Sequence, residues 1–252
     1  MLKRKERRFA VKSCDQQLIH GVLSYVGSKP LRLVIFVHGL TSCTEEAKFY
    51  NGARAFESAG FAAVRFELYG GRPKSRKLSE TGISDHGADI RRLVNHFKRQ
   101  GFKEVFLVGH SLGAPSILQA GGKDVSAIVF WDGTSETWVR KSLEKWRAHY
   151  ESRLDSYVLD WGIEYIWGNK MYAECRQLQS YQQLFADLPL PVLVILAEKG
   201  VLLKDWRNFQ KRHPALVELL VIKGAGHNFE ELDTQAELLR HSVAWCRRRS
   251  RV

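Results

Sequence analysis

Residues 105–113 read VFLVGHSLG, and residues 114–120, which follow directly, read APSILQA. The apolar start of the first run predicts a buried strand, and the second run is typical of a helix. Between them lies a G-x-S-x-G pattern, which in a strand–turn–helix setting presents a nucleophilic serine. A turn this sharp leaves no room for bulk two positions from its central residue, and Gly109 and Gly113 meet that need. We therefore expect the Ser111 hydroxyl at the tip of the turn, beside helix N–H groups that can stabilise an anion.

The composition is that of a globular protein, and a single α/β domain of this length is common. The chain has 252 residues, of which 44% are hydrophobic and 26% charged, and this length allows a sizeable core. No apolar run approaches the ~20 residues that a membrane span needs, and the charged first residues are not followed by the apolar segment of a secretory signal. The four cysteines are widely spaced, which predicts free thiols and a cytoplasmic location and indicates no metal or redox motif.

Positive charge is concentrated at the two ends of the chain. The formal net charge is +12, and basic clusters occupy residues 3–8 and 247–251. Such clusters can attract nucleic acid or an anionic membrane, but no zinc-finger, RRM or Walker pattern accompanies them. We interpret them as solvated, frayed termini and expect no nucleic-acid partner.

Strands and helices alternate along most of the chain. After a hairpin at 8–12 and 17–25, apolar runs predict strands at 31–37, 61–68, 105–108, 125–131, 191–196 and 216–222, with helices at about 45–59, 84–100, 114–120, 206–211 and 234–247. This order predicts βαβ units and a mainly parallel sheet. Residues 134–188 interrupt the alternation: they are dense in Trp and Tyr, and we read them as mostly helical. Some of their rings could line an apolar pocket.

A serine needs an adjacent base to become a nucleophile, and His227 is the candidate. It lies in the sequence Gly224-Ala225-Gly226-His227 directly after the last predicted strand. Parallel strands bring their carboxyl ends to one edge of the sheet, so this loop can reach Ser111. His110 cannot fold onto its neighbour's hydroxyl, and His86 and His96 fall within a predicted helix.

An oxyanion needs two N–H donors aimed at it in advance. One donor would be the backbone N–H of Leu112, the residue after the nucleophile. The other would be that of Leu40, in the turn His38-Gly39-Leu40 after the strand at 31–37.

Together, His38-Gly39, the pattern around Ser111 and Gly226-His227 resemble the α/β-hydrolase superfamily. The stretch Arg65–Gly71 resembles the loop of bacterial esterases of the feruloyl/cinnamoyl esterase and monoacylglycerol lipase type. The resemblance covers nearly the whole chain. It implies an eight-stranded, mostly parallel sheet flanked by helices, with a helical cap inserted after the sixth strand. Residues 134–188 would form that cap, and 1–133 with 189–252 would form the core.

The acid that orients the histidine departs from this pattern. The family usually carries an Asp where this chain has Gly200. Asp132, after the strand at 125–131, is our preferred candidate, because some lipases carry their acid there and orienting the imidazole requires only reach. Glu198 and Asp205 remain alternatives, and Asp132 could equally be a turn residue before Gly133.

The leading interpretation is a serine hydrolase that cleaves a small carboxylic ester with an apolar acyl or aryl group, and it requires no cofactor. An acyl thioesterase or acyltransferase is a second interpretation, because the basic loop at 72–77 could attract a phosphorylated carrier such as coenzyme A. A binding module without catalysis is a third, favoured by Gly200. No metal is expected, since Asp85, His86 and Asp89 have no further ligand beside them.

Overall fold

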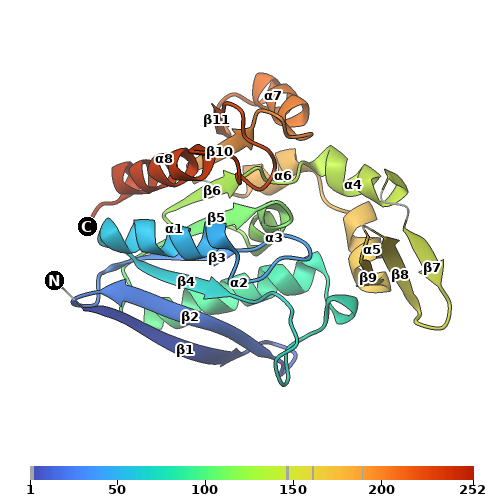
Figure 1. Ribbon diagram of the computed structural model, residues 1–252, viewed down its shortest axis with the longest axis horizontal. Helices are drawn as coiled ribbons and strands as arrows, with labels where there is room; N and C mark the ends of the chain where they lie inside the picture. Colours follow the sequence, from blue (N-terminus) through green and yellow to red (C-terminus); the bar gives the residue numbers. More distant parts are fainter. Residues whose placement is uncertain (1–2, 146–147, 161, 189) are drawn as a thin grey trace.

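The computed structural model describes residues 3–145, 148–160, 162–188 and 190–252. Its centre is an eight-stranded sheet in the order β1-β2-β4-β3-β5-β6-β10-β11 (Figure 1). The strands are β1 (Arg4–Lys12), β2 (Leu18–Val26), β3 (Arg32–Val37), β4 (Ala62–Phe66), β5 (Glu104–His110), β6 (Ala127–Trp131), β10 (Val192–Ala197) and β11 (Glu218–Ile222). β2 pairs antiparallel with β1 and β4, and the other pairs are parallel. The expected eight-stranded, mostly parallel sheet is confirmed.

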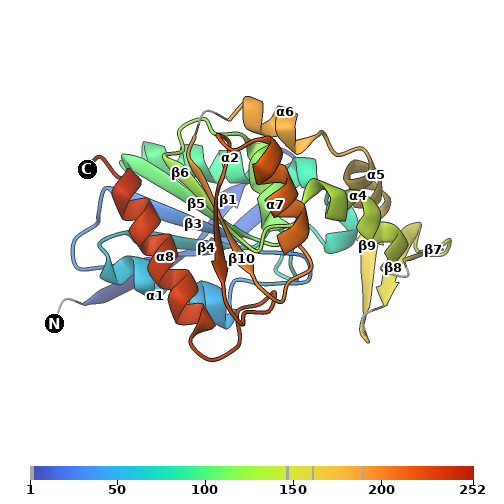
Figure 2. The same cartoon turned by 90° about the horizontal axis from the view of Figure 1, so that it is seen from above.

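Helices cover both faces of this sheet, as Figure 2 shows from above. The helices of the core are α1 (Ala47–Ser58), α2 (Ile83–Arg99), α3 (Gly113–Ala120), α7 (Leu203–Arg212) and α8 (Thr234–Arg249), with a short 3-10 turn at Leu78–Glu80. Successive side chains of a strand point to opposite faces. In β3, Leu33 and Ile35 therefore pack in the core under α2 and α3, while Val34 and Phe36 pack under α1 and α8.

The segment between β6 and β10 is only partly helical, which corrects the expected helical cap. It contains α4 (Glu136–Lys145), α5 (Asn169–Arg176) and α6 (Tyr181–Ala186), and also a three-stranded antiparallel sheet of β7 (His149–Glu151), β8 (Ser156–Asp160) and β9 (Glu164–Gly168). Tyr157 faces Trp167, and Val158 faces Ile166, across β8 and β9. Aromatic and β-branched residues pack well in such cross-strand pairs. The many aromatic residues of this segment therefore indicate β-strands as well as a packed cluster of rings.

This segment lies beyond the carboxyl ends of the parallel strands, beside the edge of the main sheet where β5 and β6 end (Figure 1). Its rings form their own cluster: the Tyr157 ring stacks on the Tyr172 ring with centroids 3.7 Å apart. The backbone between β6 and β10 therefore places aromatic side chains over the edge of the sheet at which ligands bind in open α/β folds.

The basic ends of the chain belong to regular elements, so the expectation of frayed termini is wrong for most of them. Residues 4–8 form the first half of β1, and Arg247–Arg249 form the last turn of α8. Arg4 Nε donates to Glu57 Oε2 at 2.8 Å, and the Arg249 guanidinium lies 4.4 Å from the centroid of the Trp245 ring. Pairing along the sheet and within the helix gives these backbones hydrogen bonds that a solvated terminus would lack.

Candidate active site

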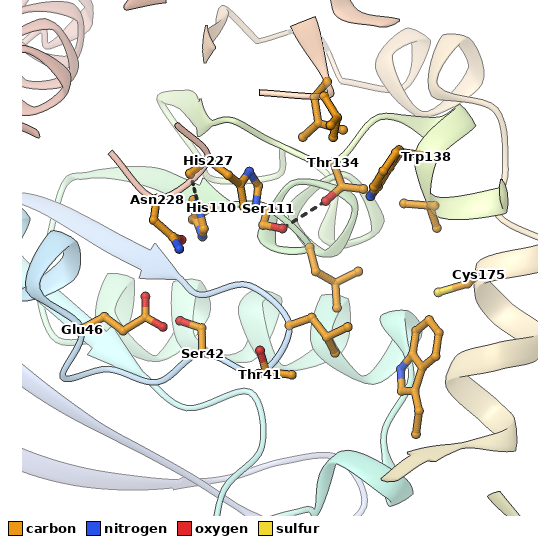
Figure 3. Close-up of a pocket in the computed structure, with 16 residues that line it drawn as sticks. Thr41, Ser42, Glu46, His110, Ser111, Thr134, Trp138, Cys175, His227 and Asn228 are labelled. Carbon is orange, nitrogen blue, oxygen red and sulfur yellow. Dashed lines mark hydrogen bonds between the residues drawn. The ribbon is translucent and has the colours of Figure 1, made fainter. Parts of the chain in front are cut away.

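Ser111 stands in a strained turn between β5 and α3. Its φ is +52°, in the left-handed region that non-glycine residues adopt rarely and mostly at functional sites. A Cβ on Gly109 would lie 2.9 Å from the carbonyl carbon of Gly113, and a Cβ on Gly113 would collide with the carbonyl oxygen of Val37. The two glycines are therefore required by close backbone packing. The Ser111 hydroxyl lies 3.3 Å from Thr134 Oγ1 (Figure 3), a neighbour that the sequence did not single out.

The structure brings His227 and Asp132 together. His227 follows β11, and its Nδ1 lies 2.6 Å from Asp132 Oδ2. The Asp132 side chain is fully buried, whereas that of His227 is 42% exposed. The Ala197 N–H donates to Asp132 Oδ1 at 3.1 Å. One carboxylate oxygen is thus fixed by the backbone after β10, and the other faces the imidazole.

Glu198 and Asp205, the two alternative acids, have other partners. Glu198 Oε2 accepts a hydrogen bond from the Gly224 N–H at 2.8 Å. Asp205 Oδ2 accepts one from Ser135 Oγ at 2.6 Å. Glu198 thus braces the turn that leads to His227, and Asp205 holds the start of the segment after β6.

Gly200 lies against the Asp132 carboxylate, although the two residues follow different strands. A Cβ at Gly200 would be 2.9 Å from Asp132 Oδ2 and 3.1 Å from the carbonyl oxygen of Ala197. A side chain at position 200 and the Asp132 carboxylate would therefore compete for the same space. This contact gives a physical reason for the glycine at the position where the family resemblance led us to expect an acid.

The two expected oxyanion donors lie at the edge of one cavity. Leu40 and Leu112 both line it together with Ser111. A Cβ on Gly39 would be 2.9 Å from Ser111 Cβ, so the turn after β3 packs directly on the turn after β5. Within the described ranges, no hydrogen-bond acceptor is bonded to the N–H of Leu40 or Leu112. Both donors are thus available to a ligand.

The cavity has a volume of about 430 Å³, within the ordinary range for small-molecule sites. Figure 3 shows Ser111 and His227 between its two ends. Trp138 and Cys175, both from the segment after β6, lie at one end. Val139, Trp167 and Leu202 add further apolar surface to the lining of the cavity. The other end carries the polar side chains of Thr41, Ser42, Glu46 and Asn228.

Two side chains that the sequence did not identify support the loop that carries His227. His110 Nε2 donates to the carbonyl oxygen of His227 at 3.0 Å. Lys48, which is buried, donates from Nζ to Asn228 Oδ1 at 2.9 Å and lies 2.7 Å from Glu46 Oε2. The nearest sequence signal was the position of His110 within the pattern around Ser111. The position of His110 indicates a contact with His227 only once the fold has placed the loop after β11 against the end of β5.

Three histidines near the site are buried and held neutral. Burial lowers the pKa of His38 from 6.5 to about 4, and it lowers the pKa values of His86 and His110 well below their usual range. The charged form of an imidazole loses its hydration in such surroundings. The unfolded chain therefore binds protons at mildly acidic pH that the folded chain does not.

Stability should accordingly fall as the pH drops below about 6.5. Because the folded pKa of His38 lies below its unfolded value, its contribution is complete above pH 6.5 and is lost as the pH falls towards 4. His38 alone should lower the free energy of unfolding by about 2 kcal/mol between pH 7.5 and pH 5. Urea unfolding at the two pH values measures this. His38→Asn should reduce the difference and His149→Gln, at an exposed position, should not. Equal stability at both pH values would contradict the account.

The basic loop at 72–77 is largely neutralised by its own neighbourhood. The buried guanidinium of Arg76 bonds to Asp89 and, at 2.7 Å, to Asp15. Arg72 Nε donates to Glu67 Oε1 at 3.2 Å. Neither arginine lines the cavity that contains Ser111. The positive charge of this loop therefore gives little support to a thioesterase or acyltransferase that binds a coenzyme A carrier.

None of the helices in the described ranges is long and apolar enough to cross a membrane. Within the same ranges, no three His, Cys, Asp or Glu side chains are grouped so as to hold a metal ion.

Comparison with known proteins assigns the family. Residues 34–241 match the model of a family described as the alpha/beta hydrolase family. The chain belongs to the alpha/beta hydrolase family. This alpha/beta hydrolase has no match among curated protein sequences.

Solved structures share the fold of this alpha/beta hydrolase. Est1E from Butyrivibrio proteoclasticus, solved with ferulic acid bound, is 15% identical with a TM-score of 0.81, over 96% of this chain and 98% of that chain. The esterase domain of a Rhodothermus marinus protein is 18% identical with a TM-score of 0.74, over 97% and 98%. The Pyrococcus furiosus esterase Pf2001 is 16% identical with a TM-score of 0.69, over 97% and 92%. The TM-scores establish a shared fold. Because the sequence identities are low, the chemistry has to be argued from the site.

Proposed function

We propose that this alpha/beta hydrolase is a serine esterase that cleaves carboxylic esters with an apolar acyl or aryl group. The observation that carries the proposal is the 2.6 Å contact between His227 Nδ1 and the buried Asp132 carboxylate. His227 lines the same cavity as Ser111. The strained turn at Ser111 supports it, because backbone strain of this kind gathers at functional sites.

In the first step, Ser111 Oγ attacks the ester carbonyl and its proton passes to His227. The proton on Nδ1 is held by Asp132, so the other ring nitrogen, Nε2, is free to act as the base. Rotation of the Ser111 side chain away from Thr134 would turn the hydroxyl towards that nitrogen. The Leu40 and Leu112 N–H groups would stabilise the charge that develops on the carbonyl oxygen.

In the second step, the protonated His227 gives its proton to the alcohol oxygen as the C–O bond breaks, leaving an acyl group on Ser111. A water molecule then attacks the acyl carbonyl and gives a proton to His227. The bond between the acyl carbon and Ser111 Oγ breaks, His227 returns the proton to Ser111 Oγ, and the carboxylic acid leaves. Neither step consumes a cofactor.

The two ends of the cavity suggest how an ester would lie. The apolar end under the segment at 134–188, which we take as a cap on the core of 1–133 and 189–252, would hold the acyl or aryl group. The polar end near Glu46 and Asn228 would face the alcohol. The exposed thiols of Cys14 and Cys43 are consistent with a reducing, cytoplasmic location.

Narrowing the apolar end should change the acyl preference. Val139 is buried, lines the cavity and follows Trp138, which lies at that end, so Val139→Phe should leave less room there for an acyl chain. We expect the ratio of kcat/KM for p-nitrophenyl octanoate over p-nitrophenyl acetate to fall about 10-fold, the scale of discrimination that an apolar pocket supplies. Both rates come from the same variant, so a partial loss of folded protein cancels. An unchanged ratio would place the acyl group elsewhere.

A further inference from the structure

The turn that carries Leu40 is held by two side chains that do not line the cavity. Tyr69, in the loop after β4, donates from its hydroxyl to the carbonyl oxygen of Gly39 at 2.9 Å. His38 Nδ1 lies 2.8 Å from the same oxygen. The two rings meet edge to face, with centroids 5.1 Å apart. One carbonyl, that of the residue before Leu40, therefore has two partners.

The tautomer of His38 follows from its other contact. The Leu68 N–H donates to His38 Nε2 at 3.0 Å, so Nε2 is an acceptor and the proton resides on Nδ1. His38 Nδ1 accordingly donates to the Gly39 carbonyl. A carbonyl oxygen has two lone pairs, and here the Tyr69 hydroxyl and the His38 imidazole use both.

The orientation of the Gly39 carbonyl decides the orientation of the Leu40 N–H. The two groups belong to one planar trans peptide, in which C=O and N–H point in opposite directions. With the carbonyl fixed on the side of Tyr69 and His38, the N–H is fixed on the opposite side. Hydrogen bonds to the carbonyl also polarise the peptide, which strengthens its N–H as a donor.

Tyr69 is itself held in place from several sides. The Gly70 N–H donates to the carbonyl oxygen of Arg76 at 2.9 Å, and the Arg76 side chain is anchored by Asp15 and Asp89. Burial raises the pKa of the Tyr69 hydroxyl, an effect that N–H groups of Thr41 and Ser42 oppose. The hydroxyl thus stays protonated and remains a donor at neutral pH.

We propose that Tyr69 is a positioning residue that sets the direction of the Leu40 N–H through the Gly39 carbonyl, with His38 as its partner. The inference rests on the proposed function, because it concerns the stabilisation of an oxyanion. Tyr69 would not touch the substrate. Its removal should therefore weaken stabilisation of the transition state and leave binding of the ground state unchanged.

The test compares Tyr69→Phe with the wild type and with Tyr25→Phe, which removes a hydroxyl from a partly buried tyrosine on β2. With p-nitrophenyl butyrate we expect Tyr69→Phe to lower kcat about 10-fold, less than the loss of a whole oxyanion donor, with KM within about twofold. The Ki of 2,2,2-trifluoroacetophenone, which adds to the serine as a charged hemiketal, should rise by a similar factor. Tyr25→Phe should behave as the wild type in both assays.

Three results would overturn the inference. They are an unchanged kcat in folded Tyr69→Phe, a rise in KM alone, and a Ki for the ketone that does not move. If the wild type hydrolyses the ester and loses this activity in Ser111→Ala, such a result counts against the role of Tyr69 alone. A wild type without esterase activity would overturn the proposed function, and this inference with it.

A second pair of variants tests the same carbonyl should Tyr69→Phe fail to fold. In His38→Asn the amide nitrogen falls near the place of Nδ1 and can still donate to Gly39. In His38→Gln the longer side chain carries the amide towards the place of Nε2, next to the Leu68 N–H. We expect kcat to be higher in His38→Asn than in His38→Gln, with similar KM. The reverse order would contradict the proposal.

Discussion

Replacing Ser111 by alanine is expected to lower kcat for p-nitrophenyl butyrate by roughly 10⁴-fold or more, the scale found when the nucleophile of a serine triad is removed. The variant loses the oxygen that forms the acyl intermediate, while the cavity and the N–H groups of Leu40 and Leu112 stay in place. Alanine is smaller than serine and accepts the same turn, so the free energy of unfolding should change little.

Ser126→Ala is the matched control. Ser126 precedes β6, and its N–H pairs with the Val105 carbonyl at the start of β5, which places it at the edge of the sheet opposite Ser111. Its kcat and KM should equal those of the wild type. A Ser111→Ala protein that keeps more than a tenth of the wild-type kcat would show that this serine is not the nucleophile.

Replacing Asp132 by asparagine should lower kcat about 10⁴-fold, because it selects the wrong tautomer of His227. The Ala197 N–H donates to Oδ1 of residue 132, so the asparagine carbonyl will keep that place and its NH₂ group will face His227 Nδ1. Nδ1 must then accept a hydrogen bond, and the ring proton moves to Nε2, where the base is needed. A kcat within about 10-fold of the wild type would assign Asp132 to a structural role.

The contact between Gly200 and Asp132 allows a sharper form of this test. Gly200→Asp alone should reduce activity, because its Cβ would press on Asp132 Oδ2 and its carboxylate would sit beside a like charge. Asp132→Gly/Gly200→Asp moves the acid to the other strand. We expect its kcat to exceed that of Asp132→Gly about 10-fold, since orienting the imidazole needs only a carboxylate within reach. If Asp132→Gly/Gly200→Asp and Asp132→Gly have equal kcat, a carboxylate at position 200 cannot replace the one at position 132.

The parts of the fold and site that depend on local patterns were predictable from the sequence. The strand–turn–helix around Ser111 is encoded within residues 105–120, where two glycines are required by backbone packing. The position of His227 at the same sheet edge as Ser111 followed from the parallel sheet alone. A chain that alternates strands and helices has few other ways to arrange them.

Other features depend on contacts between distant segments. Residues 132 and 200 follow different strands, and only the pairing of β6 with β10 brings them together. From the sequence, Gly200 suggested a missing acid, whereas in the fold it provides the space that Asp132 occupies. The role proposed for Tyr69 was hidden for the same reason, because its hydroxyl reaches the Gly39 carbonyl from a different loop, the one after β4.

The strands at 149–168 were missed because their aromatic residues fit a helix packing as well as a cross-strand packing. The pairing of Tyr157 with Trp167 decides between them in the structure. The basic first residues were read as a frayed end because they lie at a terminus, and residues 4–8, which are all charged, show no apolar alternation. Pairing with β2 over nine residues outweighs that charge.

The measurement that tests the central claim most directly is labelling of the folded protein with a fluorophosphonate, followed by mass spectrometry of its peptides. We predict one equivalent of label on Ser111, no label in Ser111→Ala, and labelling slowed at least about 100-fold in His227→Ala. Folded wild-type protein that stays unlabelled, or that carries the label on another residue, would contradict the assignment of Ser111 and His227 as nucleophile and base.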